Sequence, residues 1–158
     1  MSEQVKALPI QNPTHASTIS WRDYLELTKP RVVALMILTS VIGMLLAAPG
    51  IPGWSVLLFG NLGIALLAGA AAVVNHVVDQ KIDTVMARTR KRPVATGRIA
   101  PLDALLFATV LAALGMVVLV WQVNELTAWL TLASLVGYAG VYTLFLKRAT
   151  PQNIVIGG

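Results

Sequence analysis

Long apolar runs alternate with short polar segments along this chain of 158 residues. A helix needs about 20 apolar residues to cross the hydrocarbon core of a bilayer. Runs close to or above that length occupy Val32–Ala48, Trp54–Val78, Ala104–Trp121 and Leu126–Leu146. We therefore predict an all-α fold, a polytopic transmembrane helical bundle with four complete spans.

The segments around these runs carry their own signals. Ser20 and Asp23 have the spacing of a capping box, which predicts a short interfacial helix before the first span. The Pro- and Gly-rich segment 49–53 predicts a tight turn. The polar segment 1–19 predicts a disordered cytoplasmic tail. Ala65 and Gly69 form a small-x-x-x-small pair, which allows close approach of another helix.

The end of the sequence holds only the beginning of a further apolar run, Ile154–Gly158. Five residues cannot span a bilayer. We expect this run to be the start of a fifth span, and the chain to be the N-terminal part of a longer protein. Residues 20–158 would then form part of one membrane-embedded domain.

Composition supports a membrane protein, with 56% hydrophobic residues, 12% charged residues and a mean hydropathy of +0.74. The absence of cysteine excludes disulfides, thiolate metal sites and cysteine catalysis. The net charge of +5 does not indicate a nucleic-acid partner, because the basic residues flank the apolar runs. They lie before the first run, between the second and third, and after the fourth. This alternation predicts a multi-pass membrane protein with a cytoplasmic N-terminus. We expect the membrane to be the bacterial cytoplasmic (inner) membrane.

Candidate chemistry lies where the second run ends. Asn75, Asp79 and Asp83 follow at i, i+4 and i+8, so a helix that continues through Asp83 would place them near one face. Two carboxylates and an amide oxygen suit Mg²⁺, which keeps open positions for phosphate oxygens and water. Five basic residues between Lys81 and Arg92 could offset the remaining phosphate charge. The alternative is a helix end that simply leaves the bilayer toward the cytoplasm.

Other polar groups in the runs allow weaker hypotheses. His76 is a candidate ligating residue, as His often is, or a hydrogen-bonding residue that faces a neighbouring helix. Asn61 is expected to hydrogen-bond between helices. Tyr138 and Tyr142, one helical turn apart, are expected to serve ordinary packing, with a cavity-lining role as the alternative.

The motif Asn75-x-x-x-Asp79-x-x-x-Asp83, followed by Met86-x-Arg88-Thr89-x-x-Arg92-Pro93, resembles the first Asp-rich motif of the intramembrane prenyltransferases. The segments 27–32 and 150–158 resemble those of the haem-directed subgroup, the protohaem IX farnesyltransferases or haem O synthases. The resemblance covers nearly the whole chain after the tail. The second Asp-rich motif of that superfamily is absent from this sequence, so we expect this piece alone to be inactive.

The resemblance implies transfer of a farnesyl group from farnesyl diphosphate to a vinyl group of haem B, to give haem O. It implies that Asn75, Asp79 and Asp83 bind Mg²⁺, with the two carboxylates as catalytic groups. Arg88 and Arg92 would contact the diphosphate, with Lys81, Lys91 and His76 as further substrate-binding candidates.

Two alternatives remain open from the sequence. One is a sister prenyltransferase that acts on a quinone precursor or a chlorin. The other is a non-catalytic membrane subunit or transporter fragment, which the nearly charge-free spans disfavour.

Overall fold

The computed structural model describes residues 19–87, 89 and 91–146, and this part of the chain is helical without strands. The predicted all-α class is therefore confirmed. The tail 1–18 and the apolar segment 154–158 lie outside the described residues. In chain order the elements are α1 (Trp21–Leu27), α2 (Pro30–Ala47), α3 (Trp54–Val78), α4 (Gln80–Val85), α5 (Pro101–Gln122), α6 (Glu125–Val136) and the π-helix η1 (Gly137–Leu146).

Among the described residues, four helices are long and apolar enough to cross a membrane, which confirms the predicted number of complete spans. The second span has the predicted limits, Trp54–Val78. The fourth, Glu125–Thr143, combines α6 with the first part of η1. The helix starts also follow local rules, since Pro30 and Pro101 occupy the first turns of α2 and α5.

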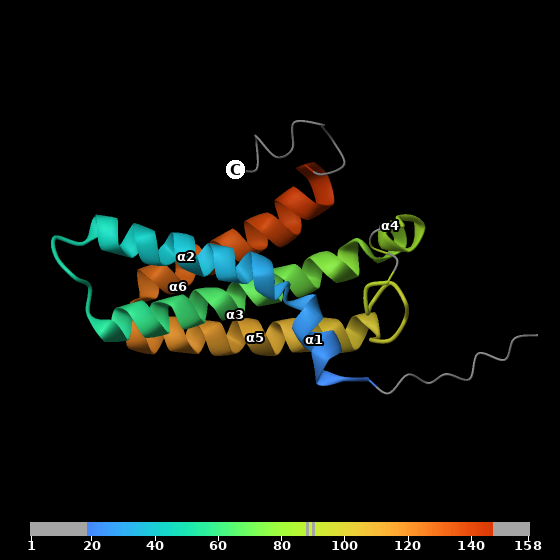
Figure 1. The fold of residues 1–158 in the computed structure, drawn as a ribbon, viewed down its shortest axis with the longest axis horizontal. Helices are drawn as coiled ribbons and strands as arrows, with labels where there is room; N and C mark the ends of the chain where they lie inside the picture. The colour runs from blue at the N-terminus through green and yellow to red at the C-terminus, as the bar shows by residue number, and fades with distance from the viewer. Residues whose placement is uncertain (1–18, 88, 90, 147–158) are drawn as a thin grey trace, which may run out of the picture.

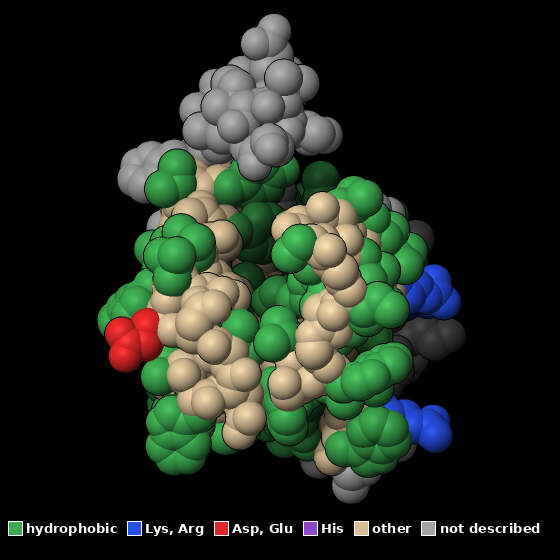
Figure 2. All heavy atoms as spheres, turned by 90° about the vertical axis from the view of Figure 1, so that its left-hand side faces the viewer, with side chains coloured by type: hydrophobic (Ala, Val, Ile, Leu, Met, Phe, Trp, Pro, Cys, Tyr) green, Lys and Arg blue, Asp and Glu red, His purple; other side chains and the backbone are tan. Residues whose placement is uncertain are grey.

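The long helices form an antiparallel bundle in which α3 is central (Figure 1). Helix α5 lies along α3, α2 packs on another side of α3, and α6 contacts both α3 and α5. The short helix α4 and the loop 86–100 lie together at one end of the bundle (Figure 1). Figure 2 looks onto the opposite end, where hydrophobic side chains and backbone dominate and charged groups lie only toward the edges.

Most of the outer surface is apolar. Helix α2 has no buried residue, and exposed side chains such as Leu46 (82%) and Trp121 (78%) lie on the helices. Such a surface is costly in water and suits contact with lipid chains or with further helices.

Helices α3 and α5 approach closely at two glycines. A Cβ atom on Gly115 would lie 3.0 Å from the Gly63 carbonyl oxygen and would overlap the Leu67 side chain. A Cβ on Gly63 would in turn overlap Leu119. In lipid, helices associate largely through such close packing, because hydrocarbon is as apolar as the helix surface.

Ala65 and Gly69 were expected to allow the close approach of another helix, and at Gly69 the neighbour is Thr28. At Gly69 a Cβ would lie 3.4 Å from Thr28 Cβ, so this glycine accommodates the junction of α1 and α2. Asn61 Nδ2 contacts Met44 Sδ on α2 at 3.7 Å, as expected for an interhelical polar residue, and also donates to Leu57 O at 2.6 Å.

The glycine contact gives a test of this packing. We expect Gly115→Ala to lower stability by about 1–3 kcal/mol, because the added methyl group meets the backbone of α3. The thermal unfolding midpoint in detergent measures the effect. Gly43→Ala is the matched control, since nothing lies within 4 Å of that position in α2. Equal midpoints for the two variants would contradict the packing described here.

Candidate functional site

The predicted polar stripe is buried at the junction of α3 and α4. The exposed fractions are 6% for Asn75, 3% for His76, 2% for Asp79 and 4% for Asp83. The segment that carries the stripe is therefore packed inside the bundle. Polar groups at such positions require partners, because burial without hydrogen bonds costs several kcal/mol.

The helix does not continue unbroken through the stripe, contrary to the sequence-based prediction. Helix α3 ends at Val78, Asp79 caps its C-terminus with φ −82° and ψ −2°, and α4 begins at Gln80. The hydrogen-bond spacing nevertheless persists, since Asp79 N donates to Asn75 O at 3.0 Å and Asp83 N donates to Asp79 O at 2.8 Å. The three candidate metal ligands therefore remain one turn apart across the helix break.

The Asn75 amide links three elements. In the orientation that satisfies its neighbours, Nδ2 donates to Asp79 Oδ2 at 2.7 Å. Its oxygen then accepts from Lys29 Nζ at 2.8 Å and from the Tyr138 hydroxyl at 3.2 Å. An ammonium from the α1–α2 junction and a phenol from η1 thus meet beside the first carboxylate.

The second carboxylate is held by the loop that follows α4. Arg92 Nη1 donates to Asp83 Oδ2 at 2.7 Å, with 25% of the Arg92 side chain exposed. The Thr89 hydroxyl donates to Asp83 O at 3.3 Å. Arg92, predicted as a phosphate-binding residue, therefore lies at the stripe.

The other predicted basic residues differ in placement. Lys81 and Lys91 are exposed and make no side-chain contact in the described hydrogen bonds and ion pairs. Arg88 lies outside the described residues.

Lys29 is a site residue that sequence reasoning missed. Lys29 has φ 51°, in the left-handed region, and directly precedes Pro30 at the start of α2. Its position in the segment 27–32, one of the segments that carry the family resemblance, was the available signal. Tyr138 packs as expected, since its ring stacks on Tyr142 at 5.5 Å and 10°. It also lines the cavity described below, which was the alternative, and it contacts Asn75, which the sequence did not predict.

His76 lies beside the cluster without a hydrogen-bond partner for either ring nitrogen among the described residues. Its side chain is nevertheless almost fully buried. The proposed role in substrate binding stays a prediction.

An apolar cavity of about 450 Å³ begins at the polar cluster and extends between α2, α3 and α6. Lys29 and Tyr138 belong both to its lining and to the contacts of Asn75. The rest of the lining is mainly aliphatic and includes Val32, Met36, Ile64, Leu67 and Leu135. A ligand with an anionic head and a hydrocarbon tail matches this arrangement.

The oxygen donors at the cluster suit a hard divalent cation. Asp79 and Asp83 supply carboxylates, and Asn75 can supply an amide oxygen. Among the described residues no group of three or more His, Cys, Asp or Glu side chains comes together. A metal held here would therefore keep coordination positions for ligand oxygens or for groups from elsewhere.

Comparisons with known proteins give a consistent result. The family model described as UbiA prenyltransferase family matches residues 36–158. A Marinobacter nauticus protein named protoheme IX farnesyltransferase is 98% identical over 98% of this chain and 51% of its own length. A Pseudomonas putida protoheme IX farnesyltransferase 1 is 70% identical over 90% of this chain and 48% of its own length. The Hahella chejuensis protoheme IX farnesyltransferase is 70% identical over 87% of this chain and 46% of its own length.

This chain spans about half the length of these curated relatives. No solved structure matches.

Measurements of unfolding can test the contact between Lys29 and Asn75. We expect Lys29→Met to destabilise the protein by roughly 1–3 kcal/mol, because the buried amide oxygen loses a charged donor. Lys81→Met, at an exposed position in α4, should leave the unfolding midpoint unchanged. Chemical or thermal unfolding in detergent compares the two. A similar midpoint for both variants would show that the Lys29 contact contributes nothing.

Proposed function

The chain belongs to the UbiA prenyltransferase family, and we propose that it supplies one diphosphate- and metal-binding cluster of a protohaem IX farnesyltransferase. The proposed activity is that of a protein with the length of the relatives, of which this chain spans about half. One observation carries the proposal: the buried Asn75–Asp79–Asp83 stripe is joined to an apolar cavity by Lys29 and Tyr138, which contact Asn75 and line the cavity.

The haem acceptor is supported by the names of the similar proteins. All three relatives described above are named protoheme IX farnesyltransferases. Their identities of 70–98% favour haem over a quinone precursor or a chlorin as the acceptor. The same names and the buried Asp cluster disfavour a non-catalytic subunit or a transporter fragment. The same names support farnesyl diphosphate as the proposed donor.

Asn75, Asp79 and Asp83 would hold the divalent metal, for which we propose Mg²⁺. When bound, the ion offsets negative charge on the departing diphosphate. Divalent-metal dependence is general in the family, and the oxygen-only donor set agrees with a hard cation. Without the metal, the charge of Asp83 is balanced by Arg92.

The basic side chains at the cluster would bind the diphosphate oxygens. Arg92 is half-buried beside Asp83, and its guanidinium can form paired hydrogen bonds with phosphate. Lys29 Nζ lies 2.8 Å from the Asn75 oxygen, and Lys29 also lines the cavity, so it could contact the same head group. Both cations would stabilise the leaving group as the allylic C–O bond breaks.

The cavity would hold the isoprenoid chain. Its aliphatic lining excludes water from the allylic cation that forms when diphosphate departs with the bonding electrons. Electrons of the haem vinyl group then form the new C–C bond. Water adds to the resulting cation and loses a proton, which gives the hydroxyl group of haem O.

We also propose that the cluster faces the cytoplasm at a bacterial inner membrane. Each described Lys or Arg residue lies either N-terminal to the second turn of α2 or between α3 and α5. The segments 48–53 and 123–124, at the opposite end, contain none. The positive-inside rule then assigns the charged end to the cytoplasm.

The metal assignment predicts a loss of turnover in two conservative variants. In the full-length enzyme, Asp79→Asn and Asp83→Asn should each reduce haem O formation at least about 100-fold, because each removes a charged ligand without changing side-chain size. Product is measured by mass spectrometry in membranes supplied with haem B, farnesyl diphosphate and Mg²⁺. Asp103→Asn, an exposed acid in the first turn of α5, is the control. Normal turnover in both stripe variants would refute the metal assignment.

The orientation predicts the results of reporter fusions. A fluorescent protein fused after Lys91 should fluoresce, and alkaline phosphatase at the same site should be inactive, because that site is cytoplasmic. Fusions within 49–53 or after Asn124 should give the opposite pattern. A reversed pattern would place the Asp cluster on the far side of the membrane and exclude a cytoplasmic supply of diphosphate.

A further inference from the structure

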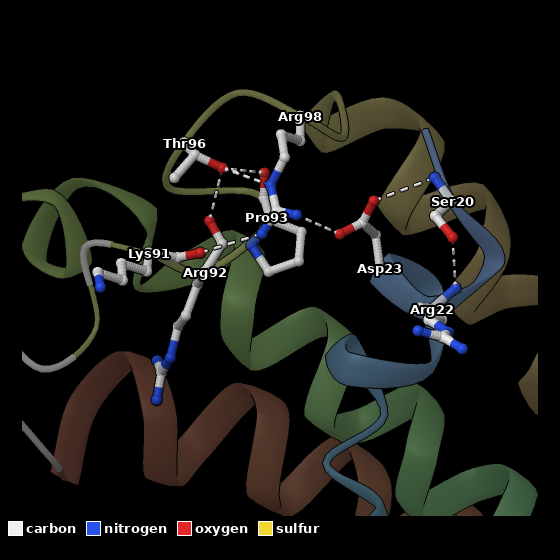
Figure 3. Close-up of polar contacts among 8 residues, drawn as sticks. All are labelled: Ser20, Arg22, Asp23, Lys91, Arg92, Pro93, Thr96 and Arg98. Atoms are coloured by element: carbon white, nitrogen blue, oxygen red, sulfur yellow. Dashed lines mark hydrogen bonds and ion pairs between the residues drawn. The ribbon is translucent and has the colours of Figure 1, made fainter. Parts of the chain in front are cut away.

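Arg98 differs from Lys91 and Arg92, the other basic residues of the loop that the structure describes, in that all three of its guanidinium nitrogens contact protein groups. Nη1 pairs with Asp23 Oδ1 at 2.5 Å, Nη2 donates to Lys91 O at 3.2 Å, and Nε donates to the Thr96 hydroxyl at 3.2 Å. Figure 3 shows Arg98 directed toward Asp23, whereas the Arg92 side chain leaves the loop in another direction. Arg98 therefore lies in the basic loop but is directed toward α1.

Asp23 joins this loop to the start of α1. Its side chain is 8% exposed, and its second oxygen accepts from Ser20 N at 3.1 Å in the capping box (Figure 3). The Asp23 carboxylate thus takes part in the N-terminal cap of α1 and also binds Arg98, which lies 75 positions away in the sequence. A buried carboxylate with both oxygens engaged fixes its partners in position.

The contacts continue from Arg98 to the candidate site. The Thr96 hydroxyl, which accepts from Arg98, donates to Arg92 O at 3.0 Å. The Arg92 side chain then pairs with Asp83 at 2.7 Å. Asp23 on α1 and Asp83 on α4 are thereby connected through Arg98, Thr96 and Arg92.

Helix α1 is also held by apolar contacts that do not involve this ion pair. Leu27 is fully buried, and the rings of Tyr24 and Phe107 form an edge-to-face contact at 5.0 Å. Within the loop, Val94 and Ile99 belong to the same apolar cluster as Leu27. The ion pair is therefore not needed to dock α1, and its loss should change the loop more than the fold.

We propose that Asp23 and Arg98 are positioning residues that hold the loop on α1 and so place Arg92 opposite Asp83. This inference rests on the proposed function in one respect, namely that Arg92 binds the diphosphate. Neither Asp23 nor Arg98 touches the substrate in this assignment. Their effect on turnover passes through Arg92.

A double-mutant cycle in the full-length enzyme tests this dependence. Asp23→Asn keeps an acceptor for the helix cap but removes the charge, and we expect the KM for farnesyl diphosphate to rise about tenfold. In an Arg92→Gln background, which itself raises KM, the same change should alter KM less than about twofold. Arg98→Gln should behave like Asp23→Asn, and Glu26→Gln, an exposed acid of α1, is the control. An equal effect in both backgrounds, or an unchanged KM in Asp23→Asn, would overturn the positioning role.

Limited proteolysis tests the loop without reference to activity. In membranes open to trypsin on both sides, we expect cleavage within 86–100 to be about tenfold faster in Asp23→Asn and Arg98→Gln than in Glu26→Gln. Unchanged cleavage would refute the attachment of the loop to α1. If cleavage accelerates but Arg92→Gln leaves KM unchanged, the attachment stands and the diphosphate role of Arg92 is wrong.

Discussion

The burial of charged and polar side chains at the end of an apolar helix is the constraint on which this structure depends. Asp79 and Asp83 are almost fully buried at the junction of α3 and α4. An unpaired carboxylate in such a place is unfavourable by several kcal/mol, so neighbouring elements must supply donors and cations. Arg92 comes from the loop to Asp83, while Lys29 and Tyr138 come from the α1–α2 junction and from η1 to Asn75. The loop, the α1–α2 junction and η1 therefore each lie where they supply a donor or a cation to the buried polar groups.

The apolar part of the bundle fixes the frame in which these groups meet. Gly63 and Gly115 bring the backbones of α3 and α5 together, so the two ends of the segment between these helices are held at a defined separation. In a lipid environment this contact works through packing and not through exclusion of water. The segment 79–100 connects the two helices. Within it Gly97 adopts φ 73°, a conformation that favours glycine.

The polar cluster and the apolar cavity form one continuous arrangement because they share two residues. Lys29 and Tyr138 contact the stripe with their polar tips and line the cavity between α2, α3 and α6. Tyr138 lies in η1, and π-helical turns are frequently found at functional sites. An amphiphilic ligand with an anionic head would therefore have its cleavable bond at the boundary between the two environments.

The sequence alone was sufficient to predict the number of spans, their limits to within a few residues, the capping box at Ser20 and the Asn75–Asp79–Asp83 stripe. These features depend on hydropathy, turn residues and helix periodicity, which act over a few neighbouring positions. Only the tertiary structure decided the helix break at Asp79, the glycine contact of Gly63 and Gly115, and the partners of the buried groups. Lys29, Tyr138 and the Asp23–Arg98 pair join positions far apart in the chain. Which distant donor reaches a buried acceptor depends on how the helices pack, and local sequence patterns do not encode that geometry.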